Sequence, residues 1–96
     1  MQTLKTDPSV FQAVWDGDKT FEIRFNDRNF EVGDLLILRE TVSTGAEMKS
    51  GKALIFTHRS IRAIVSHVLR GPIYGLQDGW VILSLAQIRN ICEYRK

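Results

Sequence analysis

Most apolar residues of this chain recur at the spacing of β-strands, and one short stretch has helical spacing. A helix is predicted over residues 7–15, because Asp7 is a suitable N-cap and Pro8 suits the first helical position. Its apolar stripe consists of Val10, Phe11, Val14 and Trp15. The other apolar stretches alternate with polar residues or are rich in β-branched residues, so the fold is predicted to be mainly β.

Four further stretches are predicted to be strands. Residues 21–25 alternate apolar with polar side chains, and residues 35–38 form an unbroken apolar run typical of a strand buried on both faces. Residues 53–70 are mostly β-branched or aliphatic and fit one long bent strand or two strands broken near residues 57–60. Residues 80–85 form another strongly apolar strand.

The order of these segments indicates the fold class. Residues 41–51 and 71–79 are polar or rich in glycine and are predicted to be loops. One helix with several mainly antiparallel strands predicts an α+β, mainly β fold: a small barrel or highly curved sheet with the helix packed against it. A length of 96 residues fits a single domain over residues 1–96, with a core over about 4–85 and a tail over 86–96.

Composition excludes several classes of protein. With 44% hydrophobic and 25% charged residues, the chain resembles ordinary globular proteins. Cys92 is the single cysteine, so we expect neither an intramolecular disulfide nor a cysteine-based zinc site, and we expect Cys92 to be a small buried residue. His58 and His67 lack a third ligand at recognisable spacing, so no metal or other cofactor is expected.

The location of the protein is also predicted from its apolar stretches. None approaches the roughly 18 apolar residues that a membrane span requires. The first ten residues lack the basic and then apolar pattern of a signal peptide. We therefore expect a cytoplasmic protein without a membrane partner.

The net charge of +2 conceals an uneven distribution. Residues 1–47 carry nine acidic and five basic residues, whereas residues 48–77 carry five basic residues and no acidic one. A basic face attracts phosphates, which makes Arg59, Arg62 and Arg70 candidates for contacts with a nucleic-acid backbone. A solvated strand surface explains the same pattern equally well.

One motif precedes and enters the first of the alternating strands. Residues 17–24 have the form G-x-K-x-x-E-x-R, with Lys19, Glu22 and Arg24 at the charged positions. Because Glu22 and Arg24 are two residues apart on a strand, they lie on the same face and can pair. The motif resembles the signature of ASCH domains, a small β-barrel family within the PUA-like superfamily.

The resemblance extends over residues 4–85 and is to an uncharacterised bacterial and phage branch. The further matching segments are Leu4-Lys5-Thr6, Asn26-Asp27-Arg28-Asn29-Phe30, Val32-Gly33-Asp34, Leu69-Arg70-Gly71, Tyr74-Gly75-Leu76 and Val81-Ile82-Leu83. The chain departs from the family at Thr3, where a histidine is expected, and in its longer tail. The resemblance implies a PUA-like barrel whose cleft binds RNA or modified nucleotides.

The residues themselves are compatible with that role. Lys19 and Arg28 suit phosphate, and the Glu22 carboxylate suits an amine of a base. The candidate cleft residues are Lys5, Lys19, Thr20, Glu22, Arg24, Arg28 and Tyr74. Tyr74 is the predicted stacking residue because it lies in a glycine-flanked loop, whereas the other aromatic candidates are expected in the core: Trp15, Phe21, Phe25, Phe30 and Phe56. The alternative is that Glu22 and Arg24 form an ion pair that holds the mouth of the barrel.

An enzymatic role is a second hypothesis. One branch of ASCH proteins removes the acetyl group from N4-acetylcytidine with a Lys, Thr and Glu arrangement. Here Lys19 is present, but Glu22 occupies the position of the nucleophilic threonine, and Thr20 is displaced by about 6.6–6.8 Å along the strand. The same chemistry is therefore not expected, although a hydrolase with Lys19 and with Glu22 as general base remains an alternative.

The tail supports a third hypothesis, a phage or prophage protein-interaction module. Ile88, Ile91 and Cys92 fall at helical spacing, so a helix is expected that packs on the barrel or on a second chain. The leading hypothesis is a non-catalytic domain that binds RNA or a modified nucleotide.

Overall fold

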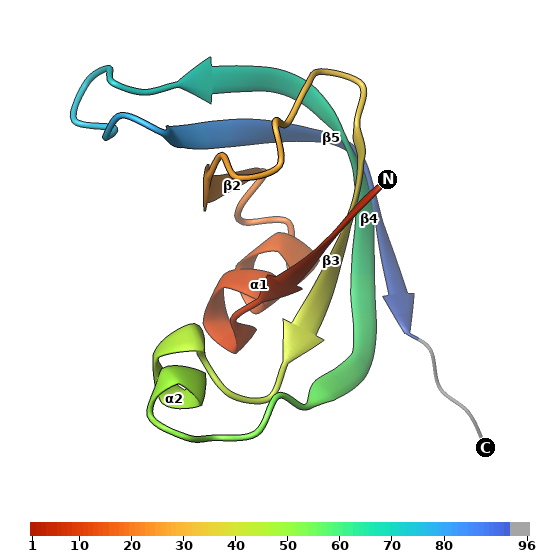
Figure 1. Cartoon of the computed structure of the whole chain (residues 1–96). Helices are drawn as coiled ribbons and strands as arrows, with labels where there is room; N and C mark the ends of the chain where they lie inside the picture. Colours follow the sequence, from red (N-terminus) through yellow and green to blue (C-terminus); the bar gives the residue numbers. More distant parts are fainter. Residues whose placement is uncertain (93–96) are drawn as a thin grey trace.

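The computed structural model describes residues 1–92, in which five strands and two short helices follow one another. In chain order they are β1 (Gln2–Thr6), α1 (Pro8–Trp15), β2 (Phe21–Phe25), β3 (Leu35–Thr41), α2 (Gly45–Lys49), β4 (Phe56–Arg70) and β5 (Trp80–Cys92). All five strands belong to one sheet in the order β1-β3-β4-β5-β2. β1 and β2 therefore lie at its two edges (Figure 1).

Long, bent strands curl this sheet into a half-barrel. β1 is parallel to β3, and the other neighbouring pairs are antiparallel. The register between β4 and β5 shifts between Arg62 and Ile64 and again between Val65 and His67. Such bulges increase the twist of a strand pair, so the sheet curves around α1, which lies on its concave side (Figure 1).

The core lies between α1 and the concave face of the sheet. α1 contributes Phe11 and Val14, and the segment before β3 contributes Phe30. The sheet contributes Leu4, Leu36, Leu38, Ile61, Ala63, Val65, Val81, Leu83 and Leu85. The predicted α+β, mainly β fold with a helix packed against a curved sheet is confirmed.

The predicted tail helix is wrong for residues 86–92, which continue β5. β4 extends well beyond the part that residues 80–85 cover, and residues 89–92 pair with its free edge. A bulge at Gln87, with φ of 52°, interrupts the period of two in β5, and residues 89–92 then pair regularly with residues 59–62 of β4. Ile88 packs against the core, whereas Cys92 is exposed and not buried as expected. The expectation for residues 93–96 lies outside the described residues.

Two other segments differ in detail from their predictions, and for a third the structure selects one of two alternatives. The predicted loop 41–51 contains α2, which begins with a capping box between Thr44 and Glu47. Residues 56–70 form one strand, as one of the two alternatives proposed. In residues 35–38, Leu36 and Leu38 are buried and their neighbours are half-buried, because α1 covers the concave face alone.

Candidate functional site

β2 turns its charged side chains toward the interior. Glu22 is 1% exposed, whereas Phe21, Ile23 and Phe25 are 42%, 49% and 54% exposed. Glu22 is paired with Leu83 of β5, a core residue, and paired residues point to the same face of a sheet. The prediction that Phe21 and Phe25 belong to the core is therefore wrong. Phe30 is buried as expected. Of the other aromatic residues expected in the core, Trp15 and Phe56 are half-buried.

Two cations neutralise the buried Glu22 carboxylate. Its Oε1 lies 2.9 Å from Lys19 Nζ, and its Oε2 lies 3.2 Å from Arg24 Nη2. Lys19 Nζ also donates to the Phe21 carbonyl oxygen. The predicted pairing of Glu22 with Arg24 is therefore present, and each carboxylate oxygen accepts from a different cation.

Arg24 and Arg28 connect the two edges of the half-barrel. Arg24 Nη2 donates to the Lys5 carbonyl oxygen at 2.8 Å and to Thr6 Oγ1 at 3.2 Å. Arg28 Nη1 donates to the Thr3 carbonyl oxygen at 2.7 Å. These carbonyl groups belong to the edge strand β1, whose outward backbone groups have no neighbouring strand. Arginine side chains thus close the mouth of the half-barrel in place of a backbone ladder.

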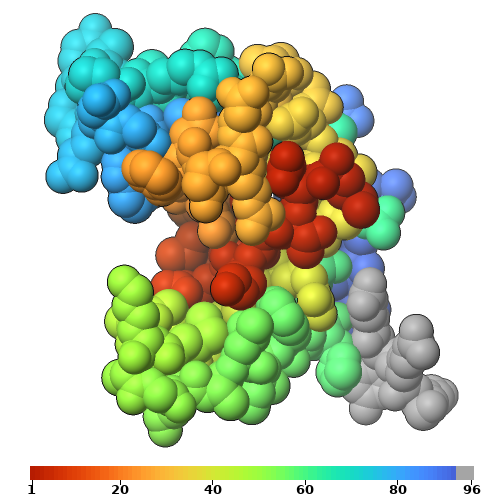
Figure 2. Space-filling model, in the orientation of Figure 1, coloured from red at the N-terminus to blue at the C-terminus, as the bar shows by residue number. Residues whose placement is uncertain are grey.

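A cleft of about 900 Å³ lies beside this closure. Its walls come from β1, β2 with the residues that follow it, and the α2 region, and Figure 2 shows the hollow between the last two. Five lining residues are cations: Lys5, Arg24, Arg28, Lys49 and Lys52. Three are acids: Asp7, Glu22 and Asp27. Asp7 does not cap α1 with its side chain as predicted but accepts from the Gly45 amide, which connects α1 to α2.

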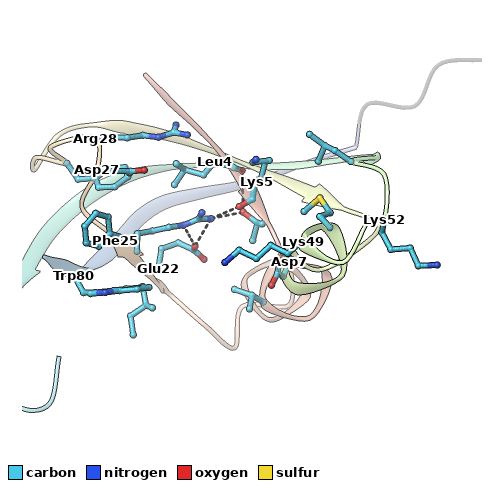
Figure 3. Close-up of a pocket in the computed structure, with 18 residues that line it drawn as sticks. Leu4, Lys5, Asp7, Glu22, Phe25, Asp27, Arg28, Lys49, Lys52 and Trp80 are labelled. Carbon is cyan, nitrogen blue, oxygen red and sulfur yellow. Dashed lines mark hydrogen bonds and ion pairs between the residues drawn. The ribbon is translucent and has the colours of Figure 1, made fainter. Parts of the chain in front are cut away.

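An aromatic pair forms one end of the cleft. The rings of Phe25 and Trp80 meet edge to face, with centroids 6.0 Å apart. Gly79, with φ of 84°, leaves room for Phe25, because a Cβ at this position would lie 2.9 Å from its ring. Figure 3 shows this pair at one end of the cleft and Lys52 at the other, while the Lys49 side chain extends from α2 toward Glu22.

The structure brings four of the seven predicted cleft residues together: Lys5, Glu22, Arg24 and Arg28. Lys19 contacts Glu22 but does not line the cleft, and Thr20 is exposed outside it. Tyr74 is 96% exposed in the loop between β4 and β5 and is also outside the lining. Tyr74 is therefore not part of this cleft, where it was expected.

Sequence reasoning missed the two ends of the cleft. Lys49 and Lys52 belong to the basic stretch 48–77, but Lys49 lies in the predicted loop 41–51 and Lys52 directly follows it. Phe25 and Trp80 were assigned to strands without a functional role. Their charge and aromatic character were visible in the sequence, but their proximity depends on the curl of the sheet.

The three arginines predicted to contact phosphates do not form one surface. Arg59 lies on the concave side, where its Nη2 is 2.7 Å from Glu40 Oε2, and its guanidinium lies over the rings of Phe11 and Trp15. Arg70 donates to the Phe30 carbonyl oxygen, and Arg62 is exposed on β4. Arg59 is therefore a structural residue.

Glu40 is a second buried carboxylate and is 6% exposed. The hydrogen bond from Arg59 lowers its pKa below the ordinary value of 4.5, against the opposing effect of burial, and Thr57 also donates to it. The same hydrogen bond raises the pKa of Arg59. Glu40 is ionised at neutral pH and anchors Arg59 beneath α1.

Within residues 1–92, no group of three or more His, Cys, Asp or Glu side chains is arranged to hold a metal ion. The helices of this same region are too short to cross a membrane.

The family model of a domain of unknown function, DUF3850, matches residues 1–85. The chain belongs to the DUF3850 family. No curated protein matches it in sequence. The match to DUF3850 covers the whole cleft lining and ends within β5, whose remaining residues complete the strand.

Proposed function

We propose that the cleft binds single-stranded RNA or a modified nucleotide without catalysing a reaction. The observation that carries this proposal is the combination of a basic wall with an accessible aromatic pair at the opposite end of one cleft. The similarity of the G-x-K-x-x-E-x-R motif to that of ASCH domains supports it.

Lys49 and Lys52 are suited to phosphate. Both are exposed, and neither takes part in a salt bridge within residues 1–92. Unpaired ammonium groups bind phosphate as mobile point charges and release counterions when they do so. The α2 end of the cleft is therefore the proposed phosphate end.

Phe25 and Trp80 are suited to a base. Half of the Phe25 surface is accessible, and the partly exposed Trp80 indole lies beside it. Stacking of a base on an aromatic ring contributes about 1–3 kcal/mol and tolerates every base. A volume of about 900 Å³ is at the upper end of ordinary ligand pockets, which leaves room for a nucleotide.

Glu22 has a supporting role in this proposal. It holds Arg24 against β1, and both of its oxygens already accept hydrogen bonds from cations. A general base must be free to accept a proton from water. Because Glu22 is engaged in this way, and Lys19 and Thr20 lie outside the cleft, we do not propose the hydrolase.

The test uses a fluorescein-labelled RNA tetramer of random sequence and measures anisotropy between low and moderate salt. The double substitution Lys49→Ala/Lys52→Ala is expected to weaken binding and to reduce the slope of log affinity against log salt by about 1.4, at about 0.7 per lost phosphate contact. Both side chains are exposed, so folding is expected to be unaffected.

The two tryptophans provide an internal control. In a ¹H–¹⁵N spectrum, the tetramer is expected to shift the indole signal of Trp80, which lines the cleft, and not that of Trp15, which packs beside the core. Arg62→Ala is the matched control, because Arg62 lies outside the cleft. Unchanged affinity in the double variant together with an unmoved Trp80 signal would contradict the proposal.

A further inference from the structure

The convex face of the sheet carries a second group of basic side chains. Leu38 of β3 and Ile61 of β4 are core residues on the concave face, and successive residues of a strand point to opposite faces. Their neighbours Arg39 and Arg62 therefore point away from α1. Neither residue lines the cleft.

The register aligns these cations across four strands. Lys5 of β1 is paired with Arg39 of β3, and Arg62 of β4 is paired with Arg89 of β5. Arg39 and Arg62 are diagonal neighbours, since Arg39 is paired with Ser60. Diagonal neighbours lie about 7–8 Å apart, so the four cations form a continuous row, which we call the convex basic row.

The convex basic row lacks neutralising partners in the described structure. All four side chains belong to exposed residues, and none takes part in a salt bridge within residues 1–92. In β1, β3, β4 and β5 the one acidic residue is Glu40, which points to the concave face and binds Arg59. Like charges that face each other across strands destabilise a sheet, and a polyanion would remove that repulsion.

Two features make the convex basic row suitable for binding an extended ligand. The Arg39 guanidinium lies 3.6 Å from the centroid of the Phe56 ring, which restricts its orientation before any ligand binds. Lys5 lies on the edge strand and also lines the cleft, so it connects the cleft with the convex face.

We propose that the convex basic row is a second phosphate-binding surface, which the backbone of a single-stranded RNA follows after it leaves the cleft over the edge of β1. The identity of the ligand as RNA rests on the proposed function of the cleft, whereas the row itself is a separate feature. An anionic membrane is the less suitable partner, because none of the strongly exposed large apolar residues within residues 1–92 comes from these four strands to insert into a bilayer.

The test compares random-sequence, fluorescein-labelled RNAs of four and twenty nucleotides. Arg62→Ala/Arg89→Ala is expected to weaken binding of the 20-mer and to reduce its salt slope by about 1.4, while binding of the tetramer is unchanged. Arg62→Lys/Arg89→Lys preserves both charges and is expected to retain the slope. Thermal unfolding of the alanine variant is expected at no lower temperature than in the wild type, because a repulsive pair has been removed.

The cleft variant Lys49→Ala/Lys52→Ala separates this inference from the proposed function. If the cleft variant binds both RNAs more weakly while Arg62→Ala/Arg89→Ala binds the 20-mer like the wild type, the proposed convex surface is wrong and the proposed function of the cleft is supported. If the cleft variant binds both RNAs like the wild type while Arg62→Ala/Arg89→Ala binds the 20-mer more weakly, the convex surface is supported and the proposed function of the cleft is wrong. Loss of binding to phosphatidylserine vesicles in the convex variant, with RNA binding unaltered, would also overturn the convex RNA surface.

Discussion

At the scale of single residues, the interior of this domain depends on two buried carboxylates. Glu22 and Glu40 are each almost inaccessible, and each is paired with an arginine that reaches another part of the fold. A buried charge without partners is costly, so both carboxylates need these arginines. The arginines in turn are held in fixed positions, Arg24 against β1 and Arg59 against α1.

The pairing of Glu40 predicts how stability depends on pH. Because the pKa of Glu40 is lower in the folded protein than its ordinary value of 4.5, its ionised form favours the folded state above that pH. This contribution is lost as the pH falls through the folded-state pKa. Glu40→Gln is expected to destabilise the protein by about 1–2 kcal/mol at pH 7 and by much less at pH 3, as measured by urea unfolding.

Glu31→Gln is the matched control for this prediction. Glu31 is an exposed carboxylate with no salt bridge within residues 1–92, so its substitution is expected to have little effect at either pH. A stability difference between wild type and Glu40→Gln that is the same at pH 7 and pH 3 would contradict the assigned role of the Glu40 carboxylate.

At the scale of elements, β2 shows why a strand pattern is not sufficient to assign its faces. The alternation in residues 21–25 correctly predicts a strand with an apolar and a charged face. The usual assumption that the apolar face is buried fails, because the charged face of this edge strand is directed into the half-barrel and toward β1. There Arg24 donates to the Lys5 carbonyl oxygen and the Thr6 hydroxyl of the edge strand β1.

Arg24 is therefore expected to hold β1 in place. Arg24→Ala removes two hydrogen bonds to β1 but leaves Glu22 paired with Lys19. Hydrogen exchange of the β1 amides is expected to accelerate about tenfold, which corresponds to a loss of about 1.4 kcal/mol from hydrogen bonds with a charged donor.

The same experiment contains its own comparisons. Amides in the paired centre of β4 and β5 are expected to be affected much less, because the Arg24 side chain donates to Glu22, Lys5 and Thr6 and to no residue of β4 or β5. Arg62→Ala removes an exposed arginine from another face and should leave β1 exchange unchanged. Equal exchange of β1 in Arg24→Ala and in the wild type would show that the side-chain closure does not stabilise the edge.

At the scale of the whole molecule, β5 connects the candidate site with the rest of the sheet. Its first half pairs with β2, and its second half pairs with β4 over residues 59–64. Asn90 of the second half donates to the Trp15 carbonyl oxygen at the end of α1. The segment beyond the DUF3850 match is thus part of the fold.

Deletion of residues 86–96 tests that conclusion. It removes the β5 partner of residues 59–64 of β4 and the core contact of Ile88, so the unfolding temperature is expected to fall by more than 10 °C. In a domain of this size each kcal/mol corresponds to about 4–8 °C. Ile88→Ala should give a smaller decrease in the same calorimetric measurement. A truncated protein with the unfolding temperature of the full chain would contradict this role.

Much of the local structure of this chain can be predicted from signals between neighbouring residues. Pro8 and the apolar stripe that follows predict α1, and alternating, β-branched or continuously apolar residues predict β2, β3, β4 and the first part of β5, because these signals depend on neighbouring residues. The edge strand β1 was not predicted. The pairing of Glu22 with Arg24 was also predictable, since residues two apart on a strand share a face.

The tertiary structure alone decided which face of β2 is buried and which residues share the cleft. Lys49, Phe25 and Trp80 come from distant parts of the chain, and the curl of the sheet places them around one hollow. That curl depends on bulges between β4 and β5 and on arginine contacts between the two edge strands. Periodicity describes the two faces of a strand, but long-range pairing determines what each face meets.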